Sequence, residues 1–267
     1  WHDVHRLDLK TGQLTLVYKN DGYGGFDADK TLTLRLASKP LPDGGTQVER
    51  MDANGKTTPI LTIAADDALS TGISGIPVEG GVAYLLSTAG RDKAALYTLD
   101  LKDGSTTLLV ESDKADIGGI MANPETGVVE AYNVDYLKDE WIPVGDAVAA
   151  DIAFLNEQAR GQWGVTSRSR DDNLWTIVID RVTEPAAFHL YDRKARTLTK
   201  LFTVRPNLEG KTLAPMQALE IPSRDGKVLV SYLTLPPGAD ANGDGKPEQP
   251  LPLVLNEIGR ASCRERV

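Results

Sequence analysis

The sequence predicts an all-β fold of short antiparallel strands that form one sheet after another along the chain. Three observations support this: a hairpin motif that recurs at a nearly constant interval, an aspartate and a glycine at fixed places in its turn, and alternating strands between the copies. A period of roughly 40 to 50 residues built from short strands is typical of a β-propeller. We therefore expect an incomplete β-propeller over residues 1–212, with about five four-stranded blades.

The hairpin motif occurs in four copies. In each copy an alternating strand ends in aspartate, a short polar turn follows, and a second alternating strand begins. The aspartates are Asp8, Asp52, Asp100 and Asp192, so the intervals are 44, 48 and 92 residues, the last being twice 46. The missing copy falls near Asp146.

The residues of the repeated turn have a structural explanation. An aspartate carboxylate can accept hydrogen bonds from the turn amides, and a glycine supplies the positive φ that a tight hairpin needs. Gly12, Gly55 and Gly104 occupy this place in the first three copies. We therefore interpret the aspartates as turn formers and not as ligands. The fourth turn, in Asp192–Leu198, has no glycine, so we expect it to be longer or differently built.

Further strands are predicted between the hairpins. They have the alternating or continuous apolar pattern of strands in a sheet, and with the hairpins they supply about four strands per repeat. The expected ranges are 31–37, 82–88, 127–134 and 174–180.

One stretch, residues 145–161, predicts a helix instead of a hairpin. Val148, Ile152, Leu155 and Ala159 recur at helical spacing, and Asp146 is placed to cap the N-terminus. We expect a short packing helix where the missing hairpin would lie.

Composition excludes several classes of protein. The 267 residues carry a net charge of -9 without a basic cluster, which argues against a nucleic-acid partner. No apolar run approaches the roughly 18 residues of a membrane span, so no membrane partner is expected. The chain begins at Trp1 without a visible leader, and its localisation, whether cytoplasmic, periplasmic or secreted, stays open.

The character of the sequence changes near residue 213. Residues 213–238 predict two alternating strands around Ser223–Gly226, then a Pro/Gly loop, and LPLVL at 251–255 has the pattern of a buried parallel strand. This order is typical of the opening of an α/β domain. Residues 257–267, with the single cysteine Cys263, match a sequencing adapter read as coding sequence. We interpret them as a non-native adapter-derived tail.

IPSRDGKVLVSYLTLPPG followed by LPLVLN resembles the start of the peptidase domain in the prolyl oligopeptidase family of serine peptidases, which includes dipeptidyl aminopeptidases and acylaminoacyl-peptidases. Residues 167–202 resemble the last propeller blade before that domain. The resemblance implies that 213–256 begin an α/β-hydrolase (peptidase) domain. It also implies that the parent protein hydrolyses peptide bonds in short peptides, and that the propeller restricts substrate entry.

No catalytic, cofactor-binding or metal-binding residue is predicted on this chain. It has no G-x-S-x-G motif, and TGISGIP at 71–77 has the wrong spacing. We expect His2, His5 and His189 to lie in blade strands, away from any hydrolase site. DANGDGKPEQPL at 240–251 begins like a calcium loop but has Leu251 in place of the bidentate glutamate, for which Glu248 is a weak substitute. We interpret it as a solvated turn.

The alternative is a stand-alone β-propeller that binds other proteins without catalysis, although such a module has no use for LPLVL. As a part of a peptidase, the chain is predicted to be inactive, with blades missing at its N-terminus. An open ring and an exposed apolar run predict aggregation or association. Peptide specificity and oligomeric state stay open.

Overall fold

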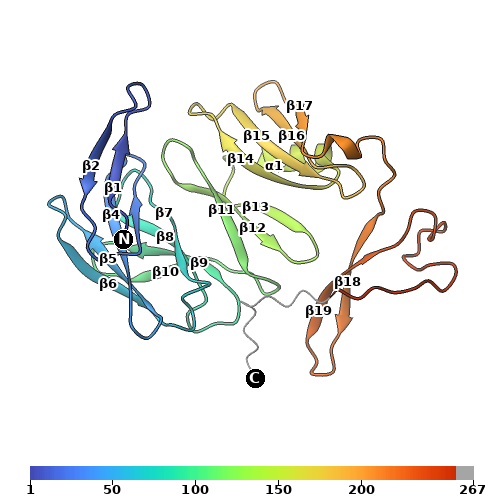
Figure 1. Cartoon of the computed structure of the whole chain (residues 1–267), viewed down its shortest axis with the longest axis horizontal. Coiled ribbons are helices and arrows are strands. Elements are labelled where there is room, and N and C mark those ends of the chain that lie inside the picture. Colours follow the sequence, from blue (N-terminus) through green and yellow to red (C-terminus); the bar gives the residue numbers. More distant parts are fainter. Residues whose placement is uncertain (257–267) are drawn as a thin grey trace. The chain divides into compact units, whose positions relative to one another are not determined.

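The computed structural model describes residues 1–256, which form 19 β-strands, one α-helix and a short 3-10 helix. All the paired strands are antiparallel (Figure 1). The chain divides into two compact units, one of Trp1–Arg181 with Pro185–Asn207, the other of Val182–Glu184 with the residues from Leu208 on. Each unit is described by itself.

The first unit contains five sheets, and the strands of each sheet follow one another in sequence order. The two-stranded sheet consists of β1 (Val4–Leu7) and β2 (Leu14–Tyr18). The next sheet consists of β3 (Gly25–Ala28), β4 (Leu34–Pro40), β5 (Thr46–Met51) and β6 (Thr57–Ile63). It is followed by β7 (Gly72–Gly75), β8 (Val82–Ser87), β9 (Ala95–Asp100) and β10 (Thr106–Val110). The three-stranded sheet consists of β11 (Ile117–Ala122), β12 (Val129–Asp135) and β13 (Asp139–Pro143). The last sheet consists of β14 (Gln162–Arg168), β15 (Leu174–Asp180), β16 (Ala187–Asp192) and β17 (Thr197–Thr203).

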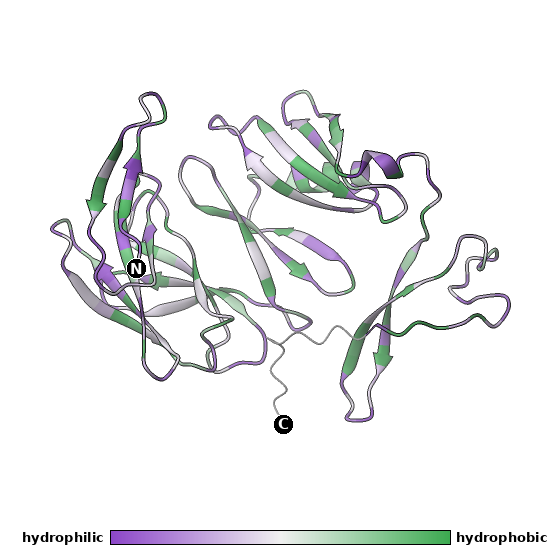
Figure 2. Cartoon of the chain, viewed as in Figure 1, coloured by the Kyte–Doolittle hydropathy of each residue, from purple (hydrophilic) through white to green (hydrophobic). Residues whose placement is uncertain are grey.

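Alternation of apolar and polar residues along the strands positions the core. In β15, Trp175, Ile177 and Ile179 are buried on one face, and the residues between them are more exposed. The same mixture of hydrophobic and hydrophilic positions runs along the other strands (Figure 2). Alternation at this period puts one set of side chains on each face of a sheet, so that each face can pack against a neighbour.

The hydrophobic core of the first unit lies between successive sheets. Leu36 and Val48, from β4 and β5, pack with Leu85 and Leu99, from β8 and β9. A second cluster joins the β7–β10 sheet to the β11–β13 sheet through Tyr84, Leu96, Ile117, Val129 and Val134. The β3–β6, β7–β10 and β11–β13 sheets therefore pack face to face in succession, which is how the blades of a propeller are stabilised.

The predicted turn chemistry is present in the hairpins. Asp8 Oδ1 accepts hydrogen bonds from the amides of Lys10 at 2.8 Å and Thr11 at 3.0 Å, and Gly12 has a φ of 72°. In the other copies the accepted amides belong to Asn54 and Lys56, to Lys102, and to Ala195. Gly55 and Gly104 also have positive φ.

The fourth turn departs from the prediction of a longer or different loop. Arg196 takes the left-handed conformation with a φ of 53°, at the same distance in sequence from Asp192 as Gly12 is from Asp8. The turn therefore keeps its length, and a non-glycine residue accepts the unfavourable backbone conformation. Arg196 Nη1 donates to Ala150 O at 2.7 Å, which anchors its side chain on the neighbouring helix.

The predicted helix is α1 (Ala149–Ala159), and it stands where the three-stranded sheet lacks a fourth strand. Its apolar stripe is buried as expected, including Ile152, Leu155 and Ala159. The predicted cap is wrong: the N-cap residue is Val148, with no side-chain capping hydrogen bond, because Asp146 lies outside the first turn. Four strands per repeat is thus confirmed for three sheets and wrong for the β1–β2 and β11–β13 sheets.

The second unit contains the predicted hairpin, β18 (Met216–Pro222) and β19 (Val228–Thr234), after the 3-10 helix at Pro206–Leu208. Gly226, with a φ of 81°, closes its turn. The prediction of a strand at LPLVL is wrong in this structure: residues 251–256 have no regular secondary structure. The described residues pair no strand with this run, so its backbone groups lack the partners that a strand requires. The tail, 257–267, lies outside the described residues.

Candidate functional site

The histidines do not assemble into a site. His5 lies in β1 and His189 in β16, as predicted, whereas His2 precedes β1. His189 is buried, and its Nδ1 lies 3.1 Å from Ala187 O. Among residues 1–256, no group of three or more His, Cys, Asp or Glu side chains could hold a metal ion. Cys263 lies outside the described residues.

The loop that resembles the start of a calcium site uses its oxygens internally. The Asp240 carboxylate accepts hydrogen bonds from the amides of Asp244 at 3.0 Å and Gly245 at 2.9 Å. Asn242 Oδ1 accepts a third from Asp244. These bonds are those of side-chain-stabilised turns, which exist without a bound ion.

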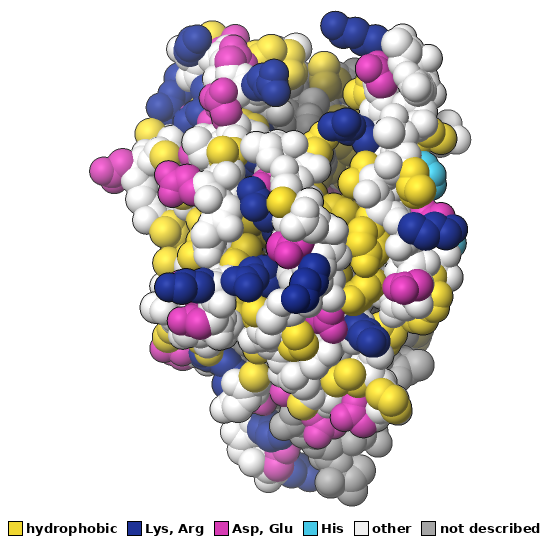
Figure 3. Space-filling view, turned by 90° about the vertical axis from the view of Figure 1, so that its left-hand side faces the viewer, with side chains coloured by type: hydrophobic (Ala, Val, Ile, Leu, Met, Phe, Trp, Pro, Cys, Tyr) yellow, Lys and Arg dark blue, Asp and Glu magenta, His cyan; other side chains and the backbone are white. Residues whose placement is uncertain are grey.

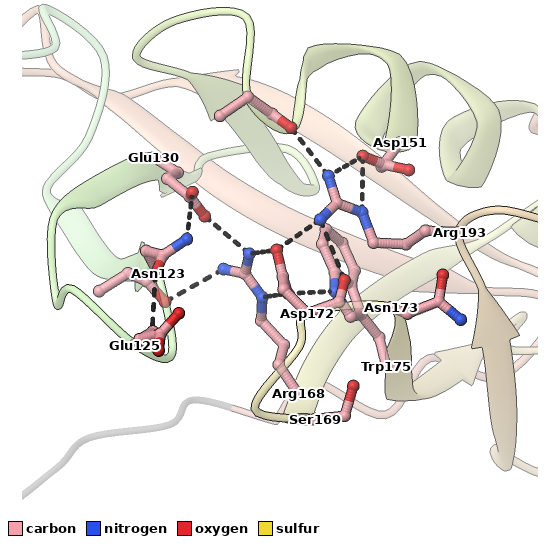
Figure 4. Close-up of polar contacts among 12 residues, drawn as sticks. Asn123, Glu125, Glu130, Asp151, Arg168, Ser169, Asp172, Asn173, Trp175 and Arg193 are labelled. Atoms are coloured by element: carbon pink, nitrogen blue, oxygen red, sulfur yellow. Dashed lines mark hydrogen bonds and ion pairs between the residues drawn. The ribbon is translucent and has the colours of Figure 1, made fainter.

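Charged side chains gather at one end of the β14–β17 sheet (Figure 4). We call Glu130, Asp151, Arg168, Asp172 and Arg193 the charged cluster. They come from β12, α1, the end of β14, the β14–β15 turn and the residue after β16, in that order. Two arginines thus meet three carboxylates at the junction between the β11–β13 sheet, α1 and the β14–β17 sheet.

Arg168 joins the two sheets. It donates from Nε to Asp172 Oδ1 at 2.6 Å and from Nη2 to Asp172 Oδ2 at 2.5 Å, a bidentate pair. Nη2 also donates to Glu130 Oε2 at 2.7 Å, and Nη1 to Ala122 O at 3.0 Å. The side chain is only 6% exposed, so these bonds are shielded from water.

Arg193 joins the helix to the same sheet. Its Nη2 donates to Asp151 Oδ2 at 2.7 Å and to Ala147 O at 2.8 Å, and Nε donates to Asp151 Oδ2 at 3.1 Å. Its Nη1 donates to Asp172 O at 3.0 Å and to the Asp172 carboxylate. Every N–H donor of Arg193 therefore has an acceptor.

Trp175 lies beneath the charged cluster. Its Nε1 donates to Asp172 Oδ1 at 2.8 Å. The guanidinium carbons of Arg168 and Arg193 lie 4.7 Å and 5.0 Å from the centre of its ring, within the range of cation–π attraction. The indole is fully buried, so it holds both cations at a fixed height above the core.

Tyr191 connects the charged cluster to the core. Its hydroxyl donates to Asp151 Oδ1 at 2.8 Å. Burial and the Asp151 carboxylate raise the pKa of Tyr191 far above its ordinary value. Burial acts to lower the pKa of Arg193, but the hydrogen bonds and charge of Asp151 outweigh it and raise this pKa. Tyr191 and Arg193 therefore both stay protonated near neutral pH.

A cavity of about 320 Å³ lies beside the charged cluster, at the N-terminus of α1. Arg193, Lys194 and Arg196 line it together with Asp151 and Asp172. It contains no histidine, serine or cysteine, so it offers no nucleophile and base for acyl transfer. The charged cluster cross-links two sheets and a helix.

Sequence reasoning missed the charged cluster. It identified Asp192 as a turn former and α1 as a packing helix, but it assigned no role to Arg193 or Asp151. One signal was available: Asp151 lies three residues after Val148 and four before Leu155, inside the apolar stripe. A carboxylate at such a position requires a buried partner.

No protein-family model matches the chain. The sequence is 45% identical over 266 residues to dipeptidyl aminopeptidase BIII of Pseudoxanthomonas mexicana, a match that covers 99% of this chain and 39% of the relative. It is 26% identical over 248 residues to dipeptidyl peptidase family member 6 of Caenorhabditis elegans, covering 89% of this chain and 34% of the relative.

The structure resembles prolyl oligopeptidase B from Galerina marginata with a TM-score of 0.51 and 12% sequence identity, over 82% of this chain and 32% of that one. At this identity the likeness concerns the fold alone, a succession of antiparallel sheets that matches the propeller of that protein. The chain spans about two-fifths or less of each relative, 39% and 34%.

Proposed function

The chain is a homologue of dipeptidyl aminopeptidase BIII and a propeller region of the prolyl oligopeptidase family, and we propose that it is the substrate-gating part of a serine peptidase acting on short peptides. The observation that carries the proposal is the 45% identity over 99% of the chain. Identity at that level, over the whole length, implies a shared fold and supports a shared role for this region.

The described residues support a non-catalytic role for this part. They bring together no serine, histidine and carboxylate side chains. In the charged cluster, every N–H donor of Arg193 already has an acceptor within the protein. We place the nucleophile, its base and the oxyanion hole of the acyl transfer outside residues 1–256. The chain by itself is then inactive.

Gating follows from rigidity. Face-to-face packing of sheets and the charged cluster give a wall that cannot yield without breaking buried contacts. A short or unfolded peptide is small enough to reach the active site beside this rigid wall. A folded domain is too large, and the wall does not deform to admit it. Selection by size thus requires no specific contact with the substrate.

Residues 213–256 are proposed as the beginning of the α/β-hydrolase domain. An isolated two-stranded hairpin is marginal in water, and β18–β19 exposes Ile221, Val228 and Leu229 by 46–53%. In LPLVL, Leu253, Val254 and Leu255 are 77–89% exposed. Apolar surface of this kind is normally covered by further structure, and a hydrolase sheet would cover it.

The test uses the full-length gene product. We expect it to hydrolyse short peptides with a free N-terminus and to lose that activity after reaction with diisopropyl fluorophosphate, which phosphorylates activated serines with loss of fluoride. The 267-residue chain should show neither hydrolysis nor labelling. A gene that ends soon after residue 256, or an enzyme insensitive to the serine reagent, would contradict the assignment.

Gating is tested separately from catalysis. One cleavable peptide is offered free and inserted in a loop of a stably folded protein, and the rates are compared. The full-length enzyme should cleave the free peptide at least about 100-fold faster than the inserted one. Arg193→Met, which loosens the packing of the sheets, should reduce this ratio of rates without raising the rate on the free peptide. Equal rates on both substrates would refute gating and leave the peptidase assignment intact.

A further inference from the structure

A second cavity, of about 260 Å³, lies between the β3–β6 sheet and the β7–β10 sheet. Leu61 and Ile63 of β6 and Leu85 of β8 line its apolar side. Ile63 and Leu85 are 6% and 2% exposed, so this wall is part of the core between the two sheets. Small-ligand sites are typically apolar clefts of about 300–1,000 Å³, so this cavity, at the small end, suits only a small ligand.

The other side of the cavity is polar and is built around Asp67. Its Oδ1 accepts a hydrogen bond from Thr88 Oγ1 at 2.8 Å. Within residues 1–256, its Oδ2 accepts none, and it is not sealed from solvent. The hydroxyls of Thr71 and Ser87, 3.3 Å apart, also line the cavity, and Ser87 is 5% exposed. Asp67 thus brings to the lining of the cavity one carboxylate oxygen that can accept a further hydrogen bond.

The charge around the cavity favours a cation. The nearby cation, Arg91, donates to the hydroxyl of Tyr97 at 3.0 Å and is paired with Glu111 at 2.6 Å. Since Glu111 balances Arg91, the charge that remains at the polar end of the cavity is that of Asp67.

We propose that this cavity binds a small primary amine with an apolar ring or chain. The ammonium donates to Asp67 Oδ2 and to the hydroxyl oxygens of Thr71 and Ser87, and the apolar part lies against Leu61, Ile63 and Leu85. The site is independent of the proposed peptidase function, because neither the reaction nor its substrate enters the argument.

Size supports this class of ligand. A dry cavity of about 150 Å³ is large enough for benzene. The 260 Å³ found here leaves room for a ring together with a methylene and an ammonium group. A bound amine also bridges β6 to β8, so it should stabilise the packing of the two sheets by mass action.

The experiment uses the 267-residue chain and benzylamine as the probe, with benzyl alcohol and benzoate as neutral and anionic counterparts. Saturation-transfer NMR and equilibrium dialysis measure binding even if the chain associates. Benzylamine should bind at least about 10-fold more tightly than benzyl alcohol, since hydrogen bonds to charged groups are the stronger kind. Benzoate should not bind.

Three variants locate the site. Asp67→Asn should abolish the preference for the amine over the alcohol, and Ala89→Phe, at an exposed position lining the cavity, should weaken both by filling it. Asp66→Asn removes the same charge from a side chain that does not line the cavity and should change affinity less than about 3-fold. Equal binding of amine and alcohol, no binding of the amine, or amine binding unchanged in Asp67→Asn or Ala89→Phe would overturn the proposal.

Discussion

Replacing Arg193 by methionine tests whether the charged cluster holds the two sheets and the helix together. The change keeps an unbranched apolar stem but removes the cation that binds Asp151, Ala147 O and Asp172. Asp151 is the residue most affected, because its side chain is 6% exposed and loses both bonds to Arg193. We expect the free energy of unfolding to fall.

The size of the loss in the free energy of unfolding depends on the contacts that Asp151 and Asp172 keep. Removing one partner of a buried ion pair costs about 3–5 kcal/mol, because the other charge stays buried without compensation. Asp151 keeps the hydroxyl of Tyr191, and Asp172 keeps its bidentate pair with Arg168. The loss should therefore lie near the lower limit, at about 3 kcal/mol.

Urea unfolding followed by tryptophan fluorescence measures the change, because Trp175 lies directly under Arg193. Lys93→Met is the matched control: its partner, Asp92, is 90% exposed, so the loss should stay below about 1 kcal/mol. In a double variant, Asp151→Asn should restore part of the stability lost in Arg193→Met, since it removes the stranded charge. A loss in Arg193→Met as small as that of the control, or double-variant effects that simply add, would refute the reasoning.

Two further predictions concern the backbone and pH. Gly104→Ala should destabilise the chain by more than about 2 kcal/mol, whereas Gly12→Ala, with a similar φ but open space, should cost about 1 kcal/mol. The added Cβ at Gly104 would meet the carbonyl of Ile60, and equal urea midpoints for the two variants would contradict this. Burial, with a smaller contribution from the charge of Arg181, lowers the pKa of His189, so its stabilising contribution is present above about pH 6.5 and is lost as pH falls through the folded-state pKa. His189→Gln should flatten that part of the stability curve, and an unchanged slope would count against it.

The hairpins could be predicted because their chemistry is local. An aspartate that accepts its own turn amides and a residue with positive φ lie within a few positions of each other, so a short stretch of sequence contains the whole motif. Asn123 plays the same part in the turn of the β11–β12 hairpin: its side-chain oxygen accepts hydrogen bonds from the amides of Glu125 and Thr126, and Gly127 has a φ of 73°. The sequence pattern did not predict this turn because it required an aspartate.

The charged cluster could not be predicted because its members are distant in sequence. Glu130 and Arg168 are separated by 38 residues, and Asp151 and Arg193 by 42. A local sequence pattern shows that a charged residue is present, but it does not predict which distant element will pack against that residue. The helix stripe indicated that Asp151 needs a partner, and only the packing of the β14–β17 sheet against α1 identifies Arg193 as that partner.

The same distinction between partners close in sequence and partners far apart explains why β18 and β19 form a hairpin, whereas residues 251–255 form no strand. A hairpin contains both strands of its ladder, so Met216–Pro222 finds its hydrogen bonds in Val228–Thr234 a few residues away. A strand of a parallel sheet depends on neighbours reached through long connections, and residues 251–255 have none among the described strands. Their composition specifies a buried strand only when the rest of a sheet is there to bury it. Leu253, Val254 and Leu255 are 77–89% exposed, so the apolar pattern alone was not sufficient to predict a strand here.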